Sequence, residues 1–240
     1  MKEVCFAYDP LGRRISKEFD GKTTNFLWDG DKIVHEWVEE IGKKPKEQPT
    51  RLTAWLFDED SFTPLAKLTS EQIYTVISNH LGTPNTMLDQ NGKVVWETEL
   101  DLFGRPILKE GGDTEETKCL FRFPGQYEDE ETGLYYNRFR YYDPQSGMYT
   151  QRDPIGLAGG NPTLYAYVHD PNAWIDPFGL WWWKKIIGTA QSTGTLGHAT
   201  VSKIYAHLYA MNPKVAKVTL NKGYNSLHTC PKQLIGHEIY

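Results

Sequence analysis

The stretch Phe6-Ala-Tyr-Asp-Pro-Leu-Gly-Arg-Arg-Ile-Ser-Lys-Glu18 reads as a strand, a tight turn and a second strand. Asp9-Pro10 favours a turn, and Gly12 supplies a permissive backbone before the second strand begins. The same Asp-x-x-Gly-Arg unit returns at Asp101–Arg105, and a longer variant occupies Tyr142–Gly147. These imperfect internal repeats predict a fold built mainly from β-hairpins.

Further hairpin signals lie between these repeats, where apolar stretches alternate with Asp, Asn and Gly. The 21 Gly and 14 Pro predict many turns, so we expect no long helix over most of the chain. Aromatic residues make up 13% of the sequence, which argues against general disorder. The expected strands include Phe26–Trp28, Lys32–Val38, Leu52–Phe57, Thr86–Leu88 and Val94–Leu100, with an exposed loop over Ile41–Arg51.

The net charge of −5 hides a division of the chain at residue 180. Residues 1–180 carry 19 basic and 30 acidic side chains, a net of −11, whereas residues 181–240 carry 7 lysines and one carboxylate, Glu238, a net of +6. The basic tail predicts weak binding to a polyanion such as nucleic acid. The alternative is that the excess lysines only keep a small domain soluble.

The cysteines Cys5, Cys119 and Cys230 are odd in number and far apart. They predict no disulfide framework and favour folding in a reducing compartment. The N-terminal stretch lacks the apolar run of a secretion signal, and no run of 18 apolar residues occurs anywhere in the sequence. We therefore expect a cytoplasmic protein with no signal peptide and no membrane span.

Two copies of Asp-Pro-x-Gly-Leu, Asp153–Leu157 and Asp176–Leu180, end the acidic part of the chain. When two carboxyl groups share a site, their repulsion keeps one protonated as an acid while the other ionises and activates a nucleophile. Asp153 and Asp176 are therefore candidates for an aspartic-type reaction. The alternative is that both Asp-Pro pairs only form turns, as most such dipeptides do.

Together with Phe123–Tyr127, Tyr135–Pro144 and Asn161–Val168, the two motifs resemble the end of the core of Rhs/YD-repeat polymorphic toxins. The resemblance is close over residues 120–180 and looser before them. It implies a hollow β-shell of YD repeats that encloses a C-terminal toxin used in interbacterial competition. It also implies three parts of the chain, which are a YD-repeat β-hairpin region at 1–119, a closing segment with the cleavage motif at 120–180 and a variable toxin-like tip at 181–240.

The resemblance further implies a reaction, because Rhs cores cleave themselves after the leucine of the second Asp-Pro-x-Gly-Leu motif with one aspartate from each motif. Carried onto this sequence, Asp153 and Asp176 form the pair, and Arg152 orients or tunes them. The scissile bond then joins Leu180 to Trp181. Such an aspartyl autoprotease needs no cofactor and no metal. The implied partners are the rest of the Rhs shell, a contact-dependent machine such as type VI secretion, and a cognate immunity protein.

Residues 181–240 predict a small α/β tip after the β-rich core. Apolar side chains over Val201–Tyr209 recur at helical spacing, Thr200 is a candidate N-cap, and Pro213 ends the helix. Val215–Leu220 then reads as a strand. The expected fold class is thus mainly β, a fragment of a YD-repeat β-shell, followed by a small α/β C-terminal tip.

Within this tip, Gly194–Ala199 and Val218–Gly223 resemble the opening third of restriction-endonuclease-like toxin domains. Nucleases of that kind hold a divalent cation with clustered carboxylates. Glu238 is the single side-chain carboxylate of residues 181–240. We therefore expect a nuclease-derived tip that truncation leaves inactive, with no metal site.

Two alternatives for the tip use histidines instead of carboxylates. The candidates for metal-free acid–base cleavage of RNA are His198, His207, His228 and His237, with Lys203 or Lys222 as the stabilising cation. His228-Thr-Cys230 and His237 form an irregular zinc pattern. Scattered histidines are more often solvated than functional.

Two classes of function follow from the sequence. The first is the C-terminal part of an Rhs toxin, in which a self-cleaving core encloses and releases the tip. The second is a non-enzymatic displaced Rhs remnant or shell-like binding protein whose aspartates only form turns. Only a few repeats precede the closing segment, so we expect a chain that begins in mid-shell and self-associates through open strand edges.

Overall fold

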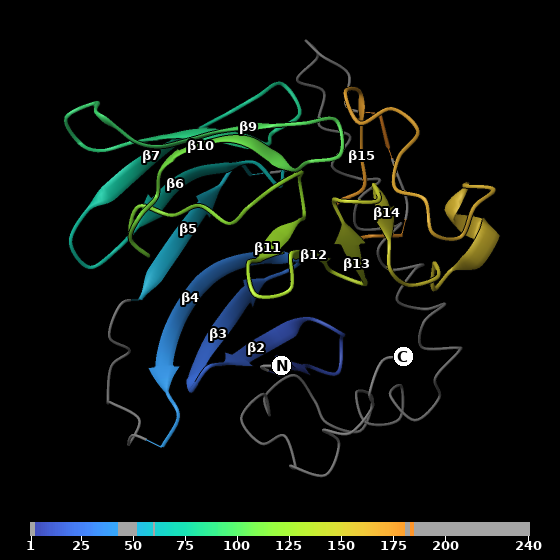
Figure 1. Cartoon of the computed structure of the whole chain (residues 1–240), viewed down its shortest axis with the longest axis horizontal. Coiled ribbons are helices and arrows are strands. Elements are labelled where there is room, and N and C mark those ends of the chain that lie inside the picture. The colour runs from blue at the N-terminus through green and yellow to red at the C-terminus, as the bar shows by residue number, and fades with distance from the viewer. Residues whose placement is uncertain (1–2, 43–51, 60, 181–182, 185–240) are drawn as a thin grey trace.

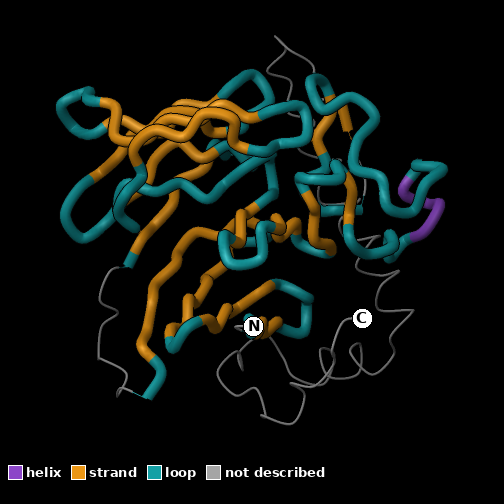
Figure 2. The backbone as a smooth tube through the Cα atoms, viewed as in Figure 1, coloured by secondary structure: helices purple, strands orange, loops and turns teal. Residues whose placement is uncertain are grey.

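The computed structural model describes residues 3–42, 52–59, 61–180 and 183–184 of the chain. Strands dominate these residues, and the one helix among them is the short 3₁₀ helix η1 (Gly156–Gly159) (Figure 2). The first sheet contains β1 (Cys5–Tyr8), β2 (Arg14–Phe19), β3 (Lys22–Asp29), β4 (Lys32–Glu40), β5 (Thr53–Phe57), β6 (Pro64–Leu68), β7 (Ile73–Ser78), β8 (Pro84–Leu88), β9 (Val94–Leu100) and β10 (Pro106–Gly111). The second contains β11 (Tyr127–Asp129), β12 (Leu134–Asn137), β13 (Arg140–Asp143) and β14 (Met148–Tyr149), and the third contains β15 (Trp174–Ile175) and β16 (Trp183–Lys184).

The ten strands of the first sheet follow one another in chain order, each antiparallel to the next. The sheet curves, and β11 and β12 lie against its inner side (Figure 1). Buried and more exposed side chains alternate along strands of the first sheet such as β7 and β9, so one face of the sheet borders an enclosed core. Met87 and Trp96 are fully buried there, and Phe121 and Tyr127 from the chain after β10 complete the cluster. The expected mainly β fold is confirmed.

The same turn joins several of the hairpins. In the β1–β2 turn, Asp9 Oδ1 accepts hydrogen bonds from the backbone N–H groups of Leu11 and Arg13, at 2.9 and 2.8 Å. Gly12 has a φ of 76°, a conformation that glycine adopts without steric cost. Equivalent side-chain bonds are made by Asn79, Asp89 and Asp101, and each of these turns also has a glycine three residues later with positive φ. The repeat expected from Asp9 and Asp101 is therefore present, and Asn79 and Asp89 begin two further copies of the same turn.

A buried ion pair ties the first sheet to the second. Arg14 of β2 and Asp129 of β11 are both fully buried, and Arg14 Nη1 lies 2.5 Å from Asp129 Oδ2. Lys17 Nζ lies 3.3 Å from the other carboxylate oxygen of Asp129. The Arg14 guanidinium also lies over the rings of four aromatic residues, which favours the cation there. These rings belong to Phe6, Phe26, Tyr127 and Tyr136.

Tyrosines form most of the core of the second sheet. Tyr135, Tyr142, Tyr149 and Tyr167 pack together with Phe123. Two of their hydroxyls reach the β9–β10 turn, because Tyr135 donates to the carbonyl of Gly104 and Tyr142 to that of Phe103, both at 2.8 Å. The closing segment of the chain is thus attached directly to a turn of the repeat sheet.

The predicted α/β tip lies outside the described residues, apart from the two residues of β16. The expected loop at Ile41–Arg51 also lies mostly outside them. Among the described residues, no helix is long and apolar enough to cross a membrane.

Candidate functional site

The aspartates of the two Asp-Pro-x-Gly-Leu motifs share one arginine. Arg140 Nη2, on β13, lies 3.1 Å from Asp153 Oδ2 and 3.4 Å from Asp176 Oδ2. The three side chains are 3%, 7% and 3% exposed for Arg140, Asp153 and Asp176 respectively. The structure therefore brings together the two carboxyl groups that the sequence paired, in a site with little water.

Asp153 lies after β14, where the chain turns toward η1. Its Oδ1 accepts from the backbone N–H of Ile155 at 2.9 Å, and its carbonyl accepts from Gly156 at 3.0 Å. Its own N–H donates to the carbonyl of Leu164 at 2.9 Å. The turn therefore uses one carboxylate oxygen of Asp153, and the other oxygen faces Arg140.

Asp176 divides its two oxygens in the same way. Oδ1 accepts from the backbone N–H of Leu180 at 3.1 Å, which closes the turn of the second motif. Oδ2 accepts from the hydroxyl of Tyr149 at 2.9 Å and faces Arg140. Turn formation and a paired-carboxylate site are therefore compatible, because each aspartate has a separate oxygen for each role.

Asn137, at the end of β12, holds this arrangement from the other side. Its Nδ2 donates to the Tyr149 hydroxyl at 2.7 Å and to the backbone carbonyl of Asp176 at 3.0 Å. Asn137 is fully buried. Its side chain therefore orients the tyrosine hydroxyl toward the Asp176 carboxylate.

The β12–β13 turn donates two hydrogen bonds to the backbone just before the expected cleavage point. The N–H of Phe139 donates to the carbonyl of Phe178 at 3.2 Å, and Arg140 Nε donates to the carbonyl of Gly179. Gly179 has a φ of 67°, and a Cβ on it would lie 2.6 Å from the carbonyl oxygen of Asn137. Only glycine satisfies both demands, so Gly179 allows the backbone to approach Asn137 closely.

Gly159 of η1 separates the Asp153 carboxyl from the Leu180 carbonyl. A Cβ built on Gly159 would lie 2.7 Å from Asp153 Oδ2 and 2.7 Å from the Leu180 oxygen. Both oxygens therefore border the same small space beside this glycine. Leu180 itself is 1% exposed. The carbonyl of the expected scissile bond thus lies next to one of the paired carboxyls.

Burial changes the protonation of the groups in this site. It raises the pKa of Asp153, and Arg140 and the Ile155 N–H oppose part of that rise. Burial and the charge of Asp176 raise the pKa of Tyr149 well above its ordinary value. Tyr149 therefore stays protonated as a hydrogen-bond donor, and Asp153 keeps its proton to a higher pH than an exposed aspartate does.

Arg152 lies apart from the paired carboxyls. Its side chain is exposed, and Nε donates to the hydroxyl of Tyr165 at 3.2 Å. The guanidinium between the two aspartates belongs to Arg140 instead. Sequence reasoning missed Arg140, Tyr149 and Asn137 as site residues, although two of the three lie within the quoted motif Tyr135–Pro144.

The remaining candidates lie outside the residues that the structure describes. They are Trp181 of the expected scissile bond and the tip residues His198, His207, Lys222 and Glu238. Within the described ranges, no group of three or more His, Cys, Asp or Glu side chains could hold a metal ion.

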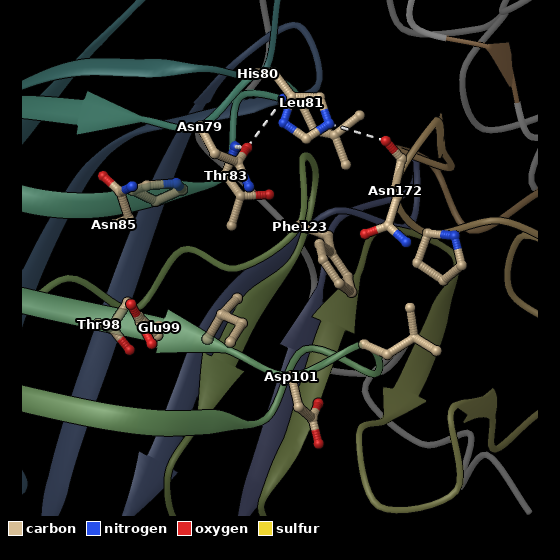
Figure 3. A pocket seen from close by; sticks show the side chains of 14 residues that line it. Asn79, His80, Leu81, Thr83, Asn85, Thr98, Glu99, Asp101, Phe123 and Asn172 are labelled. Carbon is tan, nitrogen blue, oxygen red and sulfur yellow. Dashed lines mark hydrogen bonds between the residues drawn. The ribbon is translucent and has the colours of Figure 1, made fainter.

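A cleft of about 250 Å³ lies between the β7–β8 turn and the segment that leads to Asp176 (Figure 3). Two of its lining residues, His80 and Asn172, are joined by a hydrogen bond of 2.9 Å between His80 Nε2 and the Asn172 carbonyl (Figure 3). The side chains of Thr98, Glu99 and Phe123 also line it. None of the residues that line this cleft belongs to the aspartate site.

Comparisons with known proteins match most of the chain. The sequence model of the Teneurin YD-shell family matches residues 1–158. Double-stranded DNA deaminase toxin A of Burkholderia cenocepacia is 33% identical over 207 residues, and probable deoxyribonuclease RhsA of Dickeya dadantii is 35% identical over 204 residues. These alignments cover 74% and 82% of this chain but 14% of either relative, so the chain spans about a seventh of their length.

The fold also matches a solved structure. The TcdB2-TccC3-TEV crystal structure superposes with a TM-score of 0.58 at 22% identity, over 74% of this chain and 9% of that one. At this identity the match concerns the fold alone, and it agrees with the curved repeat sheet described above.

Proposed function

Because the chain belongs to the Rhs/YD-repeat family of polymorphic toxins, we propose that it closes a toxin shell and cuts itself between Leu180 and Trp181. One arrangement supports the proposal. Asp153 and Asp176 share Arg140, and the backbone of Leu180 lies between them. The Leu180 N–H donates to Asp176, and its carbonyl oxygen borders the same small space as the Asp153 carboxyl. A reaction of this kind releases residues 181–240 from the shell.

The environments of the two carboxyls favour different roles. Asp176 accepts from the hydroxyl of Tyr149 and from the Leu180 N–H, whereas Arg140 contacts both carboxyls. The pKa of Asp153 is raised by burial, which favours its protonated form. We therefore assign Asp176 as the base that activates water and Asp153 as the acid, which is the division that paired aspartates use.

In the reaction, a water oxygen bonds to the carbonyl carbon of Leu180 while Asp176 takes one water proton. The bond from that carbon to the Trp181 nitrogen then breaks, and Asp153 gives its proton to this nitrogen. The products are a carboxyl group on Leu180 and an amino group on Trp181. The negative charge thereby passes from Asp176, which gains a proton, to Asp153, which loses one. Arg140 contacts both carboxyls and stabilises this charge on either of them.

Tyr149→Phe is expected to slow cleavage about 10- to 150-fold, because a hydrogen bond to a charged group contributes on the order of 1.5–3 kcal/mol. The change removes the hydroxyl that joins Asn137 to Asp176 and keeps the buried ring. Tyr165→Phe is the matched control, since Tyr165 is exposed and contacts Arg152 instead. The rate is read from the appearance of fragment 181–240 on a gel. Equal rates for the two variants would contradict the role of Tyr149.

Arg140→Lys and Arg152→Lys together test which arginine serves the aspartates. A lysine at position 140 keeps one charge but cannot reach both carboxylates and two backbone carbonyls with separate N–H groups. We expect Arg140→Lys to lower the cleavage rate by about 100-fold or more, in the range typical for loss of a stabilising donor. The expected change for Arg152→Lys is smaller. The reverse order would assign the orienting role to Arg152.

For the released tail, we propose nucleic acid as the binding target. Both curated relatives carry names that refer to DNA, and residues 181–240 of this chain have a net charge of +6. Binding through phosphate contacts weakens steeply with salt. A retardation assay with duplex DNA at two salt concentrations tests the proposal, and retardation that is independent of salt counts against it. A cognate immunity protein and a contact-dependent export machine remain part of the proposal for the whole toxin.

A further inference from the structure

The turn between β12 and β13 carries two residues of the site and has an unusual backbone. Asn137 and Arg140 flank it, and Arg138 within it has a φ of 58°. Residues other than glycine rarely adopt this left-handed backbone conformation, and those that do are held there by their surroundings. What holds Arg138 therefore also determines where Asn137 and Arg140 lie.

Arg138 contacts the β1–β2 and β3–β4 hairpins of the repeat sheet. Its Nε donates to Asp31 Oδ1 at 2.9 Å, in the β3–β4 turn, and its Nη2 donates to the carbonyl of Leu11 at 3.0 Å, in the β1–β2 turn. The guanidinium lies 4.3 Å from the ring centre of Phe139 and 5.9 Å from that of Trp28 on β3. Arg138 is 3% exposed, so these contacts are shielded from water.

The opposite side of the same turn holds the segment to be cut. Phe139 binds the carbonyl of Phe178 and Arg140 binds that of Gly179 through its side chain. The β12–β13 turn therefore contacts the cleavage segment on one side. On the other side it contacts hairpins that lie more than 100 residues earlier in the sequence.

A second repeat turn contacts the chain ahead of the cleavage segment. His80, in the β7–β8 turn, binds the carbonyl of Asn172 at 2.9 Å (Figure 3). Asn172 lies shortly before β15, which leads directly into Asp176. This bond therefore connects the β7–β8 turn to the segment that precedes Asp176.

We infer that Arg138 is a positioning residue that makes self-cleavage conditional on closure of the β1–β2 and β3–β4 hairpins against the β12–β13 turn. The inference rests on the proposed cleavage at Leu180 and adds its regulation. With Asp31 and Leu11 in place, Arg138 holds the left-handed turn, and Asn137 and Arg140 meet Tyr149 and the aspartates. When the hairpins are not docked, the turn relaxes and the two carboxyls lose their shared partner.

Asp31→Ala tests this coupling in the full chain, with Asp29→Ala as the matched control. Asp29 is an exposed carboxylate at the end of β3, next to the same turn, whereas Asp31 binds Arg138. Cell-free synthesis followed by a time course for fragment 181–240 gives the cleavage rate. We expect Asp31→Ala to cut at least tenfold more slowly than the wild type and Asp29→Ala to match it. A wild-type rate for Asp31→Ala would overturn the coupling.

Two variants of Arg138 itself separate contact from conformation. Arg138→Gly accepts the positive φ without strain but lacks the guanidinium, so we expect slow cleavage that added guanidinium ions at millimolar concentration restore. Wild-type cleavage by Arg138→Gly without additive would show that the conformation alone suffices and would overturn the inference. Arg138→Lys, which keeps a cation near Asp31, is expected to lie between Arg138→Gly and the wild type.

Asp153→Asn distinguishes failure of this inference from failure of the proposed function. If Asp153→Asn stays uncut while Asp31→Ala cuts at the wild-type rate, the aspartate reaction stands and the coupling is wrong. If the wild-type chain stays uncut, the proposed function itself is wrong. Thermal unfolding of each variant in the Asp153→Asn background shows whether it is folded at the assay temperature. A folded, slow Asp31→Ala supports the coupling.

Discussion

Asp153→Asn, Asp176→Asn and the double variant are each expected to leave the chain uncut at Leu180, with a loss of rate of about 10³-fold or more in every case. Groups that act as one unit lose nearly all their effect when any member is removed, so the double variant adds little. An asparagine can keep the turn bond through its oxygen, but it presents an amide N–H₂ to Arg140 where a carboxylate oxygen stood. Intact mass of the purified chain is the measurement.

Asp143→Asn is the control for this series. Asp143 also precedes a proline in the closing segment, and its Oδ1 accepts from the N–H of Gln145 at 2.8 Å, so it forms the same kind of turn away from Arg140. The control is expected to cut like the wild type. If the wild type itself stays intact, both motifs serve as turns in a shell protein without catalytic activity. If Asp153→Asn still cuts after Leu180, the paired-aspartate mechanism is wrong.

Asp129→Asn is expected to lower the free energy of unfolding by about 3–5 kcal/mol, because it leaves the buried charge of Arg14 without its partner. Lys17 loses one of its two carboxylate partners in the same step and keeps Glu131 at 2.9 Å. The four aromatic rings around Arg14 favour the cation but do not replace a carboxylate. Urea unfolding of the uncut Asp153→Asn background gives the free energy.

Lys109→Gln provides the comparison for an exposed ion pair. Lys109 Nζ lies 3.5 Å from Glu130 Oε1, and the side chains are 42% and 38% exposed. Water screens such a pair, so the expected loss is below about 1 kcal/mol. Losses of similar size for Asp129→Asn and Lys109→Gln would show that the buried pair does not join the two sheets as described.

The hairpins could be predicted from the sequence because their signals are local. Asp9 and Gly12 form a turn through bonds within five residues, and the same is true of Asp101 and Gly104. The packing of the second sheet inside the first could not be predicted in this way. It depends on pairs such as Arg14 and Asp129, which are 115 residues apart and carry no mark in the sequence of being partners.

The site could be predicted in part for the same reason. The duplicated motif pointed to Asp153 and Asp176, and the structure places both on one guanidinium. Arg152 was the natural choice for that guanidinium because it is adjacent in sequence. Arg152 is exposed, however, and contacts Tyr165 instead. Arg140 comes from a different strand, so only the three-dimensional arrangement identifies it.

The tyrosines packed in the closing segment give the folded chain an optical signal of its own. Burial raises the pKa of Tyr135 and of Tyr136 to about 12, and it raises the pKa of Tyr142 further. In an unfolded chain these phenols ionise near pH 10 and absorb in the near ultraviolet. Because folding holds their protons more tightly, this part of the stability is complete below pH 10 and is lost as the pH rises through the folded pKa values. Phenolate absorbance in alkali therefore reports opening of the segment that carries Asp153 and Asp176, without any label attached to the chain.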